Sequence, residues 1–143
     1  MAEKAEDMIA ILNGLIETCK NGEKGFREAA DSLQNAQYQS FFQEYARIRN
    51  KFARDLQGHV RILGGNPDRK GTFTGTIHRG WMNLRLALKK GDKVIVAECK
   101  RGEEAALKNY EEALTKDLPE NLRILVEKHC QEIKETCRRL AVM

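Results

Sequence analysis

Apolar side chains recur at alternating steps of four and three residues through the first quarter of the chain. This spacing places one apolar stripe along a helix, because a helix turns once every 3.6 residues. It predicts a first helix over about residues 4–33. The stripe consists of Met8, Leu12, Leu15, Cys19, Gly22, Phe26, Ala29 and Leu33.

The same reasoning predicts helices in the rest of the chain. A second helix is expected over about residues 38–63, and Gly64-Gly65-Asn66-Pro67 ends it. Its stripe consists of Phe41, Tyr45, Ile48, Phe52, Leu56, His59 or Val60, and Leu63. A shorter helix is expected over about 74–89, a third long helix over about 92–115 and a last one that ends at about 141. Short breaks at 35–37 and 118–120 make the helices on either side antiparallel neighbours.

Two helical hairpins joined by one long connection define the predicted architecture. The hairpins cover about residues 4–63 and 92–141, and the crossover covers 64–91. This order predicts one all-α domain over residues 1–143. Its topology would be an up-down-down-up four-helix bundle, the connectivity of ferritin-like folds, with a short extra helix in the crossover.

An internal repeat supports the two-hairpin prediction. The segment Ile16-Glu17-Thr18-Cys19-Lys20-Asn21-Gly22-Glu23 recurs as Val96-Ala97-Glu98-Cys99-Lys100-Arg101-Gly102-Glu103. Cysteine, lysine, glycine and glutamate keep the same spacing in both copies. Duplication of this kind indicates an architecture built twice.

The chain resembles a bacterial family of uncharacterised ferritin-like proteins, classified as a domain of unknown function. The resemblance lies in residues 15–26, in His78-Arg79-Gly80-Trp81, in residues 98–103 and in Tyr110-Glu111-Glu112-Ala113-Leu114. It implies a four-helix bundle over nearly the whole chain. It implies no specific activity, because the family has no settled function.

The composition favours a soluble helical protein with a charged surface. Charged residues make up 32% of the chain and aromatic residues 6%, and there are two prolines. No apolar run is long enough to cross a membrane, and the first residues are acidic where a signal peptide is basic. We therefore expect a cytoplasmic protein whose cysteines are free thiols on inward faces. A four-thiolate zinc site is the alternative, although the C-x-x-C pairs are absent. The cysteines are Cys19, Cys99, Cys130 and Cys137.

The repeated glutamates are the first candidates for chemistry. Ferritin-like di-metal sites take a Glu from each of two helices and a Glu-x-x-His from each of the other two. Glu23 and Glu103 each follow a stripe cysteine by four residues, which places them at the edge of the inward face. The second and fourth helices lack the matching Glu-x-x-His. A complete di-metal oxidase centre is therefore not expected.

Two interpretations of these glutamates remain. The favoured one is structural: each carboxylate pairs with an arginine of the second helix, because an uncompensated buried charge costs several kcal/mol. No cofactor is then expected. The alternative is a degenerate or single-metal site for iron or another divalent ion, formed by Glu23 and Glu103 with His59 or His129.

The crossover carries a second candidate site. His78, Arg79 and Trp81 could form a small surface for an anion or a protein partner. The structural interpretation, which we favour, is that Trp81 anchors the crossover helix to the bundle.

Charge is concentrated around the crossover. Residues 69–101 hold nine basic residues against Asp92 and Glu98, a net charge of +7, so the rest of the chain carries −3 of the total +4. A basic zone can bind nucleic acid or another polyanion. Helical spacing distributes these residues over more than one face and no nucleic-acid motif is present, so a solvated surface is favoured.

Three functions follow from the sequence, in order of preference. The first is a non-catalytic bundle that acts through homo-oligomerisation by its helix faces or by binding a protein partner. A role in stress physiology is what the ferritin-like resemblance implies for it. The second is a metal-binding or di-metal oxidase-like protein. The third is a polyanion-binding module that uses the basic segment at residues 69–101.

Overall fold

The structure is a computed structural model that describes the backbone of residues 2–143 and the side chains of residues 4–143. The described residues contain helices and no strand, so the all-α prediction is confirmed. The helices are α1 (Ala2–Ser32), α2 (Ala36–Ile62), α3 (Thr74–Trp81), α4 (Leu84–Ala87), α5 (Asp92–Leu114) and α6 (Glu120–Ala141).

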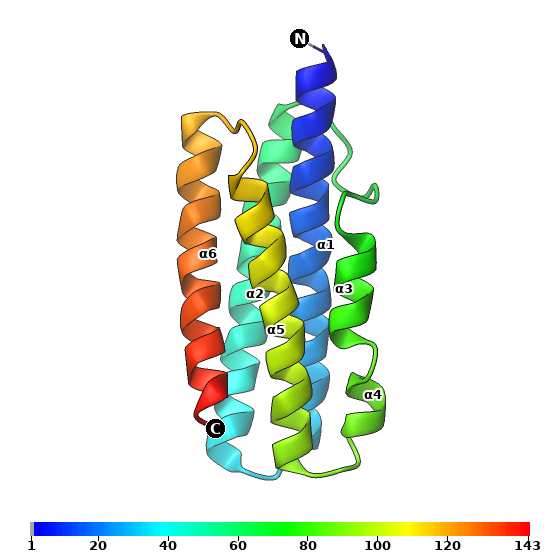
Figure 1. The fold of residues 1–143 in the computed structure, drawn as a ribbon, viewed down its shortest axis with the longest axis vertical. Coiled ribbons are helices and arrows are strands. Elements are labelled where there is room, and N and C mark those ends of the chain that lie inside the picture. Colours follow the sequence, from blue (N-terminus) through cyan, green and yellow to red (C-terminus); the bar gives the residue numbers. More distant parts are fainter. Residues whose placement is uncertain (1) are drawn as a thin grey trace.

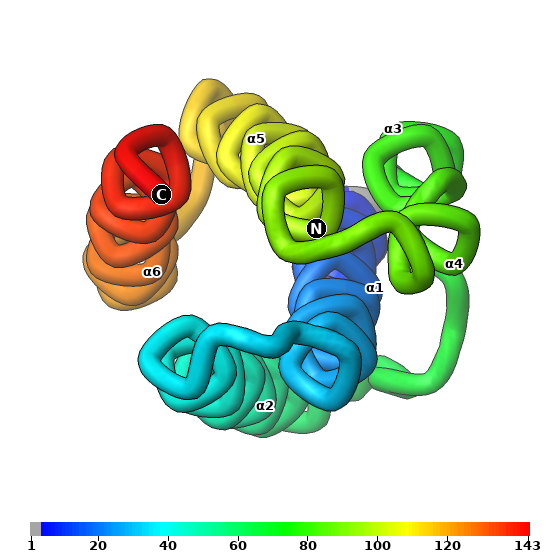
Figure 2. Tube along the Cα trace, turned by 90° about the horizontal axis from the view of Figure 1, so that it is seen from below, coloured from blue at the N-terminus to red at the C-terminus, as the bar shows by residue number. Residues whose placement is uncertain are grey.

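The four long helices lie side by side as a bundle. In Figure 1, α1 and α6 run downward, whereas α2 and α5 run upward. The end-on view in Figure 2 shows α1, α2, α5 and α6 around a common centre, with α3 and α4 outside them against α1 and α5. The pairs α1–α2 and α5–α6 are closely packed, and α1 also packs on α5. The helices α2 and α6 approach each other much less closely.

Side-chain caps at the lower end of the bundle fix the turn between α1 and α2. The side chain of Asn35 accepts hydrogen bonds from the backbone N–H groups of Gln37 and Tyr38, which satisfies the free donors at the start of α2. The Asp92 carboxylate accepts from the N–H groups of Gln34 and Asn35 at 2.8 and 2.9 Å. These bonds tie the first hairpin to the start of α5.

The apolar stripe of α1 is buried as the sequence predicts, whereas the buried face of α2 is wider than its predicted stripe. All predicted α1 positions except the half-buried Met8 are buried. On α2, Phe41 and Ile48 are only half-buried. The additional buried positions are Phe42, Ala46, Arg49 and Ala53. The helix packs on α1 and also borders the centre of the bundle, so two faces lose contact with water.

The crossover contains two helices in place of the predicted single helix over 74–89. The helix is interrupted at Met82 and Asn83, which separate α3 from α4. Ile77 on α3 packs into one core cluster, whereas Leu84 on α4 packs into the other. The break lets the crossover cover both clusters. Asparagine is a poor helix former, consistent with its place at the break.

Trp81 anchors the crossover to the bundle, as the structural interpretation predicts. Its ring lies against Gly25 of α1 and Gly102 of α5, where a Cβ atom would collide with the ring. The ring also meets Phe26 edge to face, with centroids 5.5 Å apart. Glycine at both positions therefore provides the space that the indole fills.

Two further sequence predictions can be compared with the structure. All four cysteines are free thiols, three of them buried, as predicted. Within residues 2–143, no helix is both long enough and apolar enough to pass through a membrane.

Candidate functional site

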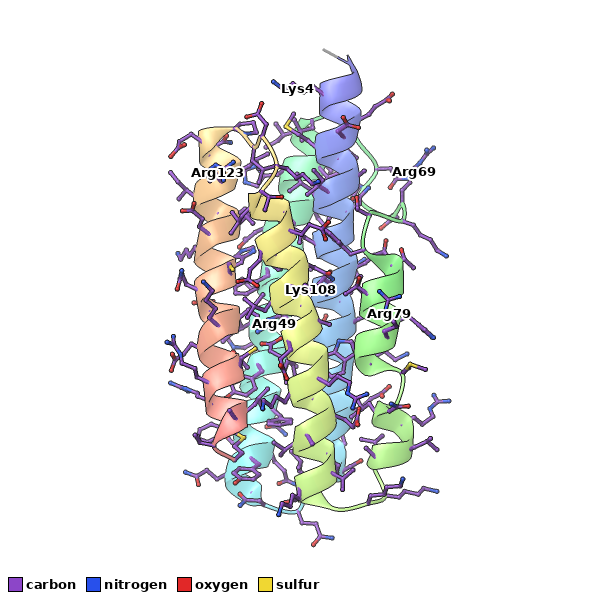
Figure 3. All side chains as sticks on the ribbon, in the orientation of Figure 1. Lys4, Arg49, Arg69, Arg79, Lys108 and Arg123 are labelled. Carbon is purple, nitrogen blue, oxygen red and sulfur yellow. The ribbon has the colours of Figure 1, made fainter. Side chains whose placement is uncertain are left out.

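Among residues 4–143, one ion pair has both side chains buried, that between Arg49 of α2 and Glu103 of α5. The Arg49 side chain is 2% exposed and the Glu103 side chain is 0% exposed. The guanidinium donates two hydrogen bonds, one to each carboxylate oxygen, so the contact is bidentate. This confirms the expected arginine partner for Glu103. Figure 3 shows Arg49 within the bundle at about half its height.

The surroundings of Arg49 stabilise its buried positive charge at this position of α2. Its guanidinium lies 5.8 Å from the Phe26 ring centroid and 5.6 Å from that of Phe52, within cation–π range. The stem of Arg49 passes Gly22, the glycine of the first repeat copy. Burial by itself would lower the pKa of Arg49, but the Glu103 carboxylate more than offsets this and leaves the pKa raised. Burial raises the pKa of Glu103, which Arg49 opposes.

A chain of hydrogen bonds lies beside this pair. The Cys19 thiol and the Tyr110 hydroxyl are 3.1 Å apart, and the Tyr110 hydroxyl is 3.0 Å from Nδ1 of His129. Burial raises the pKa of the Cys19 thiol to about 11, so the thiol stays protonated. The Tyr110 hydroxyl has one proton, so it donates to one of these two neighbours and accepts from the other.

His129 connects this chain to the surface. Its ring stacks on Phe52 with centroids 3.9 Å apart, and its Nε2 lies 3.5 Å from a carboxylate oxygen of Asp55. Burial lowers its pKa to about 4, although Asp55 acts in the opposite direction. The imidazole is therefore neutral near neutral pH. Asp55 is 39% exposed, and its 3.5 Å contact with Nε2 lacks the geometry of a hydrogen bond.

The four predicted metal ligands have separate environments. Glu103 is held by Arg49. Glu23 is 18% exposed and contacts Asn50 at 3.3 Å and Arg27 of its own helix at 3.2 Å, so the expected arginine of α2 is wrong for this copy. His129 bonds to Tyr110, and His59 is half-buried. Across residues 4–143, no group of three or more His, Cys, Asp or Glu side chains is arranged to hold a metal ion.

The predicted crossover surface is divided between two sides of α3. His78 is exposed and borders a shallow depression that also contains Trp81 and Met82. Arg79 is exposed and borders a different depression, with Arg101 and Lys108 of α5. Figure 3 shows Arg79, like Arg69 in the preceding loop, projecting away from the bundle. The three residues therefore do not form one surface.

A groove runs between α2 and α6, where the two helices are widely spaced. It consists of two cavities of about 200 and 220 Å³ that adjoin at Ile48 and Glu132. We call it the α2–α6 groove. The first cavity is lined by Tyr45, Ile48, Arg49, Glu132, Glu135, Thr136 and Arg139. The second is lined by Arg47, Ile48, Lys51, Phe52, Asp55, Leu125, Lys128, His129 and Glu132.

Three buried polar atoms that border this groove have no hydrogen-bond partner among the described residues. They are the Tyr45 hydroxyl, Nε of Arg49 and Nε2 of His129. Their residues are 6%, 2% and 2% exposed. A buried polar group without a partner costs about 1–3 kcal/mol, so such groups are rare in native structures unless they have a role. Three of them along one groove make the α2–α6 groove the candidate binding site.

The family of this chain can be identified by comparing its sequence with known protein families. A family model described as "Domain of unknown function (DUF2383)" matches residues 7–116. The chain belongs to this family. No curated protein matches the chain at a significant level. The DUF2383 match includes Arg49 and Glu103, whereas α6, with His129, follows the matched segment.

Sequence reasoning missed most of the groove. The sequence predicts an arginine partner on the second helix but does not single out Arg49, although a positively charged residue in a buried frame signals a buried partner. Tyr45 is predicted as a core residue, and its hydroxyl gives no separate signal. Asp55 and Arg139 lie outside the apolar stripes and give none. The spacing between α2 and α6, which decides that these residues meet, has no local signature.

Proposed function

We propose that this protein is a non-catalytic binding protein whose α2–α6 groove receives a small polar ligand. The observation that carries the proposal is the row of buried polar atoms without partners: the Tyr45 hydroxyl, Arg49 Nε and His129 Nε2. The two cavities, at about 200 and 220 Å³, have together the size of small-molecule sites in other proteins.

A non-catalytic role is supported by the state of the groups that could react. The Cys19 thiol has a raised pKa and lies in the interior, and a protonated thiol is a weak nucleophile. The Glu103 carboxylate has both oxygens on the Arg49 guanidinium. The directions of the four long helices support the ferritin-like resemblance. In that fold class interior carboxylates bind metal ions, whereas here the Glu103 carboxylate binds the Arg49 guanidinium.

Occupation of the groove can be tested without knowledge of the ligand. The purified protein is screened against a library of small acids, bases and neutral molecules by thermal shift, and each hit is mapped by backbone amide chemical shifts. We expect shifts for residues along both sides of the groove. Mapped hits that fall elsewhere, or no hits, would refute the proposal.

A pair of matched variants makes the test specific. Ile48→Trp places an indole at the junction of the two cavities, so it should abolish the thermal response to a groove ligand. Ile124→Trp introduces the same change at a position of α6 that is 58% exposed and borders neither cavity. It should leave the response unchanged. Sedimentation of both variants tests the rival occupant, a second copy of the chain: loss of a dimer in Ile48→Trp alone would refute the small-ligand proposal.

A further inference from the structure

The chemistry of the α2–α6 groove narrows the class of ligand. Resting on the proposed function, we infer that the ligand is a small organic acid whose carboxylate accepts hydrogen bonds from Nε of Arg49 and from the Tyr45 hydroxyl, with Arg139 at the mouth of the cavity. Each part of this arrangement follows from a separate observation.

The donors of the first cavity belong to its buried lining residues Tyr45 and Arg49, which we call its deep end. Both terminal nitrogens of Arg49 are used by Glu103, so Nε–H is the donor that remains. Burial raises the pKa of the Tyr45 phenol, against the effect of Arg139, so the hydroxyl keeps its proton. A hydroxyl proton and an N–H group at one end of a cavity suit an acceptor with two oxygens, and a carboxylate is such an acceptor.

The two carboxylates that line this cavity are paired or exposed, so its buried donors decide the class of ligand. Glu135 is already paired with Arg138 at 2.9 Å and with Arg139 at 3.6 Å. Glu132 is exposed at the rim, where a ligand cation would stay solvated. The buried polar atoms at the deep end are donors, which an ammonium group could not satisfy. Arg139 is 57% exposed at the mouth and adds positive charge where an anion would enter.

The second cavity offers two lysines to a second acidic group, beside the carboxylates of Asp55 and Glu132. Lys51 and Lys128 are exposed at its rim, and neither has an ion-pair partner among residues 4–143. Arg47, in contrast, is neutralised by Glu44. Tyr45 and Lys51 are separated along α2 by about 9 Å, from the helical rise of 1.5 Å per residue. A dicarboxylate with an extended carbon chain, such as adipate, is therefore a suitable probe. The apolar part of the ligand would lie on Ile48, which borders both cavities.

The inference is tested with adipate as the probe. Its neutral analogue adipamide, its cationic analogue hexane diamine and inorganic phosphate serve as comparisons. Binding is measured by calorimetry and mapped by amide chemical shifts on the full chain. We expect adipate to bind in the groove, and the three comparison compounds to bind at least about tenfold more weakly, the ratio that one charged hydrogen bond provides.

Three variants identify the atoms. Tyr45→Phe removes one hydroxyl that has no partner in the protein, so the fold is retained and adipate affinity falls about tenfold. Arg139→Gln at the mouth should weaken binding to a similar degree. Arg138→Gln is the control, because Arg138 pairs with the same Glu135, is 71% exposed and borders neither cavity. Its affinity for adipate should stay within about twofold of the parent protein.

The outcomes separate this inference from the proposed function. If adipamide, the diamine or phosphate binds in the groove as tightly as adipate, the inference is wrong and the groove remains a binding site. An equal loss of affinity in Arg138→Gln and Arg139→Gln would also overturn it, since the attraction would then be general. If no compound of any charge maps to the groove, both the inference and the proposed function fail.

Discussion

The ion pair between Arg49 and Glu103 leads to the most direct prediction about stability. Replacing Glu103 with Gln keeps the shape of the side chain and removes its charge. The Arg49 cation then remains in an interior where its side chain is 2% exposed, without a counter-charge. Removing one partner of a buried ion pair costs about 3–5 kcal/mol. Gln keeps one oxygen as an acceptor, so we expect a loss of about 3 kcal/mol.

Unfolding in urea is monitored by circular dichroism. The free energy of unfolding and its slope against urea concentration are compared between variants. Glu104→Gln is the control, because Glu104 is the exposed neighbour of Glu103 on the same helix. It should change the free energy of unfolding by less than about 0.5 kcal/mol. A double variant, Arg49→Met with Glu103→Gln, removes both charges. It should be more stable than Glu103→Gln alone, because no unpaired charge remains in the core.

Two results would refute this reasoning. A loss below about 1 kcal/mol for Glu103→Gln would mean that water or another carboxylate already compensates Arg49. A double variant that is less stable than Glu103→Gln would mean that Arg49 contributes chiefly through packing on Phe26 and Phe52, and not through its charge. Purified apo protein is used throughout, so that metal binding does not enter the comparison.

Two further predictions concern the glycine contacts and the buried histidine. Gly102→Ala should destabilise the protein by about 1–3 kcal/mol, because the added methyl group collides with the Trp81 ring. At Gly58 an added methyl group meets no atom within 4 Å, so Gly58→Ala should stabilise the protein by about 0.5–1 kcal/mol. Thermal denaturation measures both changes. The pKa of His129 falls from its ordinary value of 6.5 to about 4, so the unfolded chain binds more protons between these values and stability must fall as the pH is lowered through this window. Between about pH 7 and pH 5.5 the loss should be about 1 kcal/mol, and His129→Gln should reduce it; an unchanged pH dependence in that variant would contradict the assignment.

The helices could be predicted from the sequence because their signals are local. The stripe from Met8 to Leu33 specifies α1, and Gly64 ends the second helical region with a positive φ of 84°. The stop of α2 and the start of α5 depend on residues within one helical turn. Predictions of this kind need no knowledge of the partners that each helix finds.

The break in the crossover and the shape of the groove depend on contacts between distant residues. The end of α3 at Trp81 depends on how its ring fits against glycines of two other helices. The α2–α6 groove exists because α2 packs chiefly on α1 and α6 on α5, which leaves the two outer helices apart. No periodicity in either helix encodes that separation. The unsatisfied atoms of Tyr45 and Arg49 therefore became visible only in the folded chain.

The repeat shows how two similar segments come to have different roles. Gly22 in the first copy lies beside the stem of Arg49, whereas Gly102 in the second copy receives the ring of Trp81. Arg49 reaches across the interior to Glu103 and leaves Glu23 to Asn50 and solvent. With one guanidinium in the interior, only one of the two repeated carboxylates can be buried and neutralised. The interior therefore holds one charge pair and not two facing carboxylates. Arg49, whose Nε has no partner among the described residues, also lines the groove between α2 and α6.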